Sequence, residues 1–383
     1  MPGPPEGEVA PFDGLRLLSV GHTLPGLYCI AVLRDLGFDV ARVERLAGDA
    51  DRFGGLAGQF PVRSLREGTA RCAIDLKDPR GAAAFRRMAA RADVVLEGFR
   101  PGTAARLGID HAALAVENPR LIYVAISGYG QEGPWRDHAG HDLNYLAAAG
   151  ALDLAGGPDG TPGMPGATYA DGLAGLGAAI NVLAALEARR RDGRGRFVDV
   201  AITDGPLFLL SAELERWWTT GTARTRGDTH LTGAYPWYGV FETADGRYLS
   251  VAAVEPAFYD RLCRVVGHPE LADRQFVTGE ERRQQREVLR ATFRKRTRDE
   301  WVALLAEDAC VAPVFSIDEA AEAPPAARAR RELPDAAATL VRSPVRLPPA
   351  ACRPKRGTAE TLAAYGFSAE MVRALGAQGV IGE

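Results

Sequence analysis

The sequence has few cysteines and no export signal that we can identify. Its 383 residues include five cysteines, Cys29, Cys72, Cys263, Cys310 and Cys352. They are scattered, with no Cys-X-X-Cys pair and no histidine at a metal-binding spacing, so we expect reduced thiols that mostly pack in the interior. The segment from Met1 to Phe12 is rich in proline and acidic residues and lacks the basic and apolar regions of a secretory signal. We therefore expect a cytoplasmic protein.

The chain also lacks the patterns of membrane, nucleic-acid and nucleotide-binding proteins. We find no run of the ~18 apolar residues that cross a bilayer, so we expect no membrane partner. The net charge is −3, and lysine and arginine are dispersed along the chain, which argues against a nucleic-acid partner. The Gly-X-Gly-X-X-Gly fingerprint, the phosphate loop and the Gly-X-Ser-X-Gly elbow are all missing. Nicotinamide enzymes, nucleotide hydrolases and elbow-type hydrolases are thus disfavoured.

The first half of the chain has the pattern of an α/β protein. Short apolar runs that begin at Leu15 alternate with amphipathic stretches, which predicts βαβ units and a parallel sheet. A helix that ends at Gly37 separates the first two strands, and another helix opens at Asp78-Pro79. Ligands of such sheets bind at the carboxyl ends of the strands. We expect the functional residues of this half to lie there.

A second, smaller α+β unit follows a polar segment near residue 220. Two alternating runs around Ala244-Asp245-Gly246 predict a β-hairpin, and helical patterns continue from Glu255 to about Glu307. The length of the chain agrees with two folding units, because one domain ordinarily has ~100–200 residues.

Two histidines, His138 and His141, stand three residues apart in the segment HAGHDLNY. A zinc site would need further ligands, and no clustered carboxylates or thiols accompany the pair, so we expect no metal. A histidine near a helix start is usually structural. It is also the side chain whose unperturbed pKa lies closest to neutrality, which suits a general base. The motif by itself leaves both interpretations open.

Asp171 lies where a Gly/Pro-dense loop from Gly156 to Gly166 leads into a long predicted helix. Aspartate is favoured at such a position simply as an N-cap. Three arginines follow predicted strands: Arg45, Arg100 and Arg106. Each one alone is most simply a surface ion-pair partner, but their shared position favours a phosphate-bearing ligand.

Several blocks of the sequence resemble one family along essentially the whole chain, the class III coenzyme A transferases. The resemblance is carried by DLGFDVARVER, AIDLKDPRG, ADVVLEGFRPGTAARLGID and NPRLIYVAISGYGQEGP. Three further segments are similar to the α-methylacyl-CoA racemase branch: GHDLNY (140–145), VEPAFY (254–259) and DACVAPVFSIDE (308–319). The resemblance implies a Rossmann-like large domain, 1–215 with 331–383, a small domain, 216–330, and an interlocked homodimer.

The resemblance also implies an activity in lipid metabolism and its residues. It implies that the enzyme is an isomerase that inverts C2 of a 2-methyl-branched acyl-CoA, with His141 and Asp171 as the acid/base pair on opposite faces of the α-carbon. Glu255 would support them. Coenzyme A, as part of the substrate and with no prosthetic group, would contact Arg45, Lys77, Arg100 and Arg106. The alternative is a transferase that moves coenzyme A between carboxylates through a thioester at Asp171.

The residue types agree with proton transfer at the α-carbon of a thioester. This reaction needs a base, a proton donor and stabilisation of the enolate oxygen. Because Asp171 begins a helix, we expect free N–H groups around Gly172 and Leu173 to meet the developing negative charge. The same groups are expected to depress the pKa of Asp171.

Overall fold

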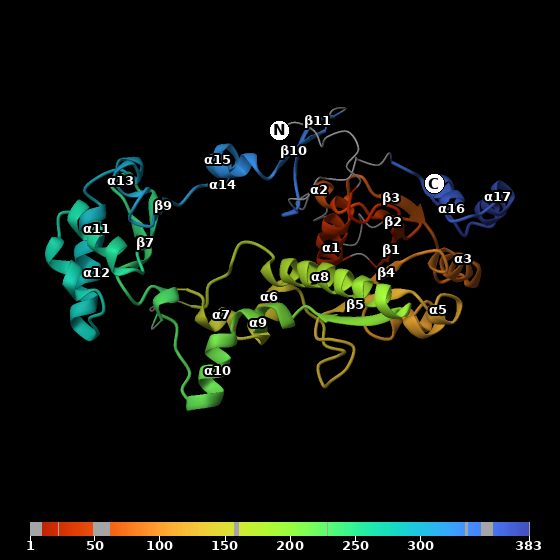
Figure 1. Ribbon diagram of the computed structural model, residues 1–383, viewed down its shortest axis with the longest axis horizontal. Helices are drawn as coiled ribbons and strands as arrows, with labels where there is room; N and C mark the ends of the chain where they lie inside the picture. The colour runs from red at the N-terminus through yellow and green to blue at the C-terminus, as the bar shows by residue number, and fades with distance from the viewer. Residues whose placement is uncertain are drawn as a thin grey trace. The chain divides into compact units, whose positions relative to one another are not determined.

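The chain forms two compact units, shown in Figure 1. The computed structural model describes residues 10–21, 23–48, 62–156, 161–227, 229–333, 336–345 and 355–382. The large unit comprises Met1–Ala149, Ala167–Leu209 and Ala329–Glu383, and the small unit comprises Gly150–Gly166 and Leu210–Arg328. The main segment of the small unit is Leu210–Arg328, whereas the resemblance implies a small domain at 216–330. Cys352 and residues 1–9 lie outside the described residues.

The large unit contains the predicted parallel sheet. Its strands are β1 (Arg16–Val20), β2 (Asp39–Glu44), β3 (Ala70–Ala73), β4 (Val94–Glu97), β5 (Ile122–Ser127) and β6 (Arg196–Ala201). All neighbours are parallel, in the order β3-β2-β1-β4-β5-β6. Every residue of β4 and β5 is buried, which explains why these strands read as continuous apolar runs. The order reverses between β1 and β4, and such a reversal is where ligands of open α/β sheets bind.

Two long helices of the large unit, α1 (Leu24–Asp35) and α8 (Tyr169–Asp192), pack against each other, as Figure 1 shows. Small residues of α8 allow the close approach. A Cβ atom at Gly175 would lie 2.5 Å from the Cβ of Tyr28 and 2.6 Å from the carbonyl oxygen of Pro25. The close packing of α1 against α8 therefore requires a glycine at position 175.

Helix α8 corrects one expectation from the sequence. By length and composition it could cross a membrane, since an 18-residue window has a mean hydropathy of 1.4. Of that window, 39% is buried inside the structure, including Ala174 and Ala178. The sequence of α8 did not stand out as a membrane-spanning run, because glycines and alanines make up much of the helix. Core helices of soluble proteins pass the same test.

The opposite face of the sheet carries α3 (Pro79–Ala89), α5 (His111–Glu117) and α16 (Thr358–Ala364) in one apolar core. Helix α3 begins as predicted, because the side chain of Asp78 accepts the N–H of Arg80. The C-terminal segment belongs to this core through Leu362 and Tyr365. It continues into α17 (Ala369–Ala377) and ends with an isolated bridge between Ile74 and Ile381.

The small unit is built on an antiparallel sheet. Its strands are β7 (Tyr238–Glu242), β8 (Tyr248–Ala252) and β9 (Val311–Pro313), in the order β7-β8-β9. The predicted hairpin turn is present, with Gly246 in the left-handed region at φ +71°. The main helices are α10 (Ser211–Thr220), α11 (Pro256–Val265), α12 (Gly279–Phe293) and α13 (Arg298–Leu305). Cys263 is buried in its core, and Cys29 and Cys72 are buried in the large unit, whereas Cys310 is exposed.

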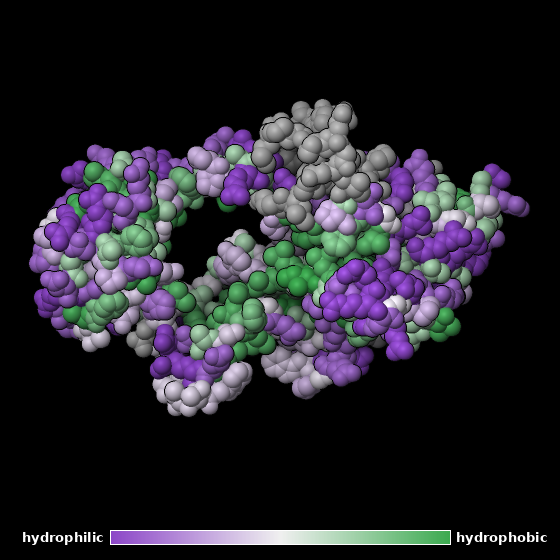
Figure 2. Space-filling view, viewed as in Figure 1, coloured by the Kyte–Doolittle hydropathy of each residue, from purple (hydrophilic) through white to green (hydrophobic). Residues whose placement is uncertain are grey.

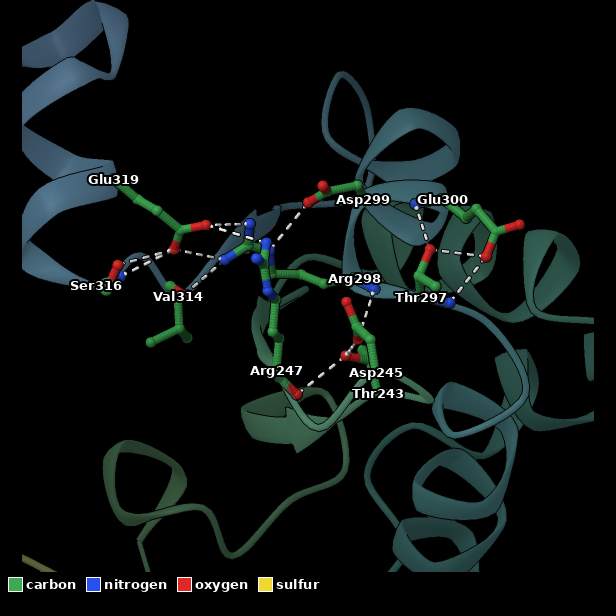
Figure 3. Close-up of polar contacts among 10 residues, drawn as sticks. All are labelled: Thr243, Asp245, Arg247, Thr297, Arg298, Asp299, Glu300, Val314, Ser316 and Glu319. Atoms are coloured by element: carbon green, nitrogen blue, oxygen red, sulfur yellow. Dashed lines mark hydrogen bonds and ion pairs between the residues drawn. The ribbon is translucent and has the colours of Figure 1, made fainter.

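A buried arginine fixes the segment of the small unit that follows β9 (Figure 3). Arg298, only 3% exposed, donates two hydrogen bonds to Glu319, at 2.9 and 2.7 Å, and one to the carbonyl of Val314 at 3.2 Å. The paired guanidinium lowers the pKa of Glu319 to about 2. This fork holds α14 (Ile317–Glu322) against the start of α13.

Candidate active site

The turn that carries His141 is held by its own neighbours. His141 directly precedes α6 (Asp142–Ala148), and its side chain is exposed. Its backbone N–H donates to Oδ1 of Asn144 at 3.0 Å, while its carbonyl accepts the N–H of Asn144 at 2.8 Å. The hydroxyl of Tyr145 donates to the carbonyl of Gly140 at 2.6 Å. The motif residues therefore fix the backbone on both sides of His141.

Asp142 links this turn to Asp171. The backbone N–H of Asp171, the third residue of α8, donates to Oδ1 of Asp142 at 2.9 Å. Because Asp142 follows His141 directly, the hydrogen bond joins the two elements that carry the expected acid/base pair. The N-cap of α8 is Thr168, so the interpretation of Asp171 as an N-cap is wrong.

The carboxyl of Asp171 can both accept and release a proton near neutrality. Burial, with a smaller contribution from the charge of Asp142, raises the pKa of Asp171 to about 7. The expected depression of this pKa is wrong, because the helix terminus does not outweigh these two effects. The N–H of Gly172 is also not free, since it donates to the carbonyl of Thr168 at 3.1 Å. A pKa near the working pH is what general acid/base catalysis requires.

Tyr145 is a residue of this site that the sequence analysis did not single out. Burial and then the charge of Asp171 raise the pKa of its phenol to about 12, while Arg100 acts in the opposite direction. The ring of Tyr145 packs directly against the backbone of two glycines. A Cβ atom at Gly128 would lie 2.6 Å from the ring, and a Cβ atom at Gly140 would lie 2.7 Å from it. In the sequence, Tyr145 could have been found as the last residue of the motif GHDLNY.

The four residues expected to contact coenzyme A all follow strands at the carboxyl edge of the large sheet. Arg45 follows β2, Lys77 follows β3, and Arg100 follows β4. Arg106 ends the short helix α4 (Thr103–Arg106), and its guanidinium donates to Oγ1 of Thr103 at 2.8 Å. All four side chains are exposed. Four exposed basic side chains thus follow the carboxyl ends of β2, β3 and β4.

The ends of β1 and β4 approach each other closely at the point where the strand order reverses. A Cβ at Gly98 would lie 2.6 Å from the carbonyl oxygen of Gly21. Beside it, the buried carboxylate of Glu97 accepts the N–H of Phe99 at 2.7 Å. Burial raises the pKa of Glu97 to about 7. Glu97 is not recognisable from the sequence, because a strand-end glutamate gives no sign of its burial.

Glu255 belongs to the small unit, where it is the exposed N-cap residue of α11. The backbone before Glu255 is held by Gln275, whose side-chain amide donates to the carbonyls of Ala253 at 3.2 Å and Val254 at 2.8 Å. Cys310 has a left-handed backbone at φ +50°. Burial raises the pKa of its thiol, and the charge of Glu255 raises this pKa further. The backbone that leads to Glu255 is thus fixed, and its side chain is exposed.

The structure shows no metal centre in the part of the chain it describes. No group of three or more histidine, cysteine, aspartate or glutamate side chains there could hold a metal ion. The ring of His138 stacks on Trp135, with centroids 5.5 Å apart, and lies edge-on to Tyr129 at 6.0 Å. His138 is accordingly held as part of an aromatic cluster.

Comparison with known proteins agrees with this architecture. The α-methylacyl-CoA racemase of Mus musculus is 34% identical over 374 residues, which cover 94% of each chain. The acetyl-CoA:oxalate CoA-transferase of Acetobacter aceti is 32% identical over 358 residues, 90% of each chain. The crystal structure of a CaiB/BaiF family protein from Brucella suis superimposes with a TM-score of 0.78 at 27% identity, covering 93% of this chain and 99% of the other.

The resemblance found in the sequence is confirmed by a family model that matches nearly the whole chain. The model is described as CoA-transferase family III, and it matches residues 12–358. This chain therefore belongs to CoA-transferase family III.

Proposed function

We propose that the protein is an isomerase that epimerises C2 of a 2-methyl-branched acyl-CoA. The observation that carries the proposal is the hydrogen bond from Asp171 to Asp142, which joins the turn of His141 to a carboxyl group with a pKa of about 7. Two proton-transfer groups on connected elements are what inversion of a carbon acid requires. The similar racemases from mouse and human support the same reaction.

In the proposed reaction one member of the pair removes the α-proton, and the C–H electrons pass into the thioester carbonyl as an enolate. The other member then delivers a proton to the opposite face of C2, so that one proton is lost and one gained. The coenzyme A part would be held by the four cations at the sheet edge. Arginine suits its phosphates because the guanidinium forms two parallel hydrogen bonds.

A homodimer is part of this proposal. Figure 2 shows apolar side chains gathered over α1 and α8 on the viewed face of the large unit. On α8 they include Leu176 and Ile180, the latter 65% exposed, and Leu209 at the end of α9 (Asp204–Leu209) is 66% exposed. Contiguous exposed apolar surface is typical of a protein–protein interface. A second copy of the chain would cover it.

The second candidate is transfer of coenzyme A between carboxylates, with Asp171 as the nucleophile. It is favoured by similarity to transferases, such as the succinyl-CoA–D-citramalate CoA-transferase of Chloroflexus aurantiacus, 36% identical over 281 residues. That chemistry does not by itself call for a second proton-transfer group. The turn of GHDLNY, with its fixed and exposed His141, is better explained by racemisation.

Incubation of one epimer of a 2-methylacyl-CoA in deuterated water tests both candidates. Racemisation predicts deuterium at C2 and product of both configurations, whereas absence of exchange would exclude it. A free dicarboxylate in a parallel sample tests transfer through formation of a new thioester.

His141→Ala provides the residue-level test of the proposal. It should slow exchange by at least ~10², the usual cost of losing a general base. The matched control is His138→Ala, three residues away in the same segment and in the aromatic cluster, which should keep most of the rate. An unchanged rate in His141→Ala would remove His141 from the mechanism.

A further inference from the structure

The small unit contains a cleft that the proposed reaction does not use. It has a volume of about 310 Å³ and is lined by Arg216, Arg224, Thr229, His230 and Tyr235. Arg216 lies on α10, and the other four follow that helix. All five are polar, and two carry a permanent positive charge. The cleft is therefore built unlike a site for an apolar acyl chain.

The side chains of the cleft have hydrogen-bond donors to spare. Nε of Arg216 is buried and has no hydrogen-bond partner among the residues that the structure describes. Within the described part of the chain, His230 and Tyr235 have ring contacts but no side-chain hydrogen bond. The ring of Tyr235 stacks on Trp237 at 4.9 Å, and the ring of His230 stacks on Trp237 at 6.2 Å. Their rings are thus held in place while their polar atoms stay available.

The charge of the cleft is only partly balanced. Arg224 faces Glu213 at 3.7 Å, which is beyond ordinary hydrogen-bond distance. Among the described residues Arg216 has no acidic partner at all. Buried donors without partners are uncommon, because each one costs about 1–3 kcal/mol when left unsatisfied. A bound anion would balance the charge of the two guanidinium groups.

Size selects among the anions. Guanidinium groups pair with carboxylates and phosphates through parallel hydrogen bonds, and imidazole and phenol groups add further donors. A volume of about 310 Å³ is more than one small inorganic ion fills. The geometry points to a short organic acid: we propose that this cleft binds a small carboxylate through Arg216 and Arg224.

Calorimetric titration of the full-length protein with succinate tests this site. Saturable binding is expected, and Arg216→Gln and Arg224→Gln should each weaken it by about tenfold or more, as expected for loss of a charged hydrogen bond. The matched control is Arg264→Gln, an exposed arginine of the same unit that pairs with Asp260 at 2.8 Å. It should bind as tightly as the unaltered protein.

Three results would overturn the proposal. They are absence of succinate binding, equal binding by the Arg216 and Arg224 variants, and inorganic phosphate binding more tightly than succinate in a second titration. Tyr235→Phe keeps the ring stack and removes one hydroxyl, so it provides a milder variant should an arginine variant fail to fold. Because no thioester is present, the result is independent of whether the protein racemises acyl-CoA.

Discussion

Replacement of Asp142 by asparagine would reveal what sets the ionisation of Asp171. The amide oxygen of asparagine can still accept the N–H of Asp171, so the link between α6 and α8 is kept while the negative charge is removed. The pKa of Asp171 rises from an ordinary 3.8 to about 7, with burial as the larger cause and Asp142 as the smaller. Asp142 thus accounts for less than half of the rise, on the order of one pH unit or ~1.4 kcal/mol.

The assay is a carboxyl titration by nuclear magnetic resonance with ¹³C-labelled aspartate, the Asp171 signal being assigned from Asp171→Asn. In Asp142→Asn the midpoint should fall by about one pH unit, because the ionised form no longer faces a like charge. Asp192→Asn, an exposed change of the same charge at the far end of α8, is the control and should leave the midpoint in place. A midpoint that stays or rises in Asp142→Asn would refute the reasoning.

Two further predictions concern stability. Glu97 has a folded pKa of about 7 against an ordinary 4.5, so the native state holds its proton more tightly than the unfolded chain does. Its stabilising contribution is complete below about pH 4.5 and is lost as the pH rises through 7, at a cost on the order of 3 kcal/mol. Glu97→Gln should therefore lose less stability than the unaltered protein between pH 5 and pH 8, as measured by urea unfolding, and equal losses would contradict the burial argument. Gly175→Ala should destabilise by roughly 1–3 kcal/mol because α1 leaves no room for the Cβ, whereas Gly177→Ala on the same helix meets nothing within 4 Å and should stabilise by up to ~1 kcal/mol; similar effects at both positions would contradict the packing argument.

Features set by neighbours in sequence were predictable. The cap at Asp78, the turn at Gly246 and the alternation of strands and helices all depend on a few adjacent residues, and the structure confirms them. The segments that resemble the family were equally recognisable, because each is a continuous stretch of sequence. The roles implied for Arg45, Lys77, Arg100, Arg106, His141, Asp171 and Glu255 stay predictions.

Features set by distant residues were not predictable. The pKa of Asp171 depends on burial and on Asp142, 29 positions earlier, so an argument from its own helix terminus had the wrong sign. The same holds for Glu97, whose burial depends on the elements packed around β4. Arg216 gave no signal either, because the sequence of α10 does not reveal that the Nε atom of this arginine is buried.

The ionisation of Asp171 also separates the two candidate reactions. Racemisation needs the pair of His141 and Asp171 to share one proton, so that one group can accept and the other donate. The exchange rate should then fall both at low pH, where both are protonated, and at high pH, where neither is, giving a bell-shaped profile whose apparent pKa values belong to the pair. Transfer through an acyl-aspartyl bond needs only ionised Asp171, whose pKa is about 7, so its rate should rise through neutrality and then level off. A deuterium-exchange profile that reaches a plateau above pH 8 would thus argue against the two-base mechanism even if some exchange occurs.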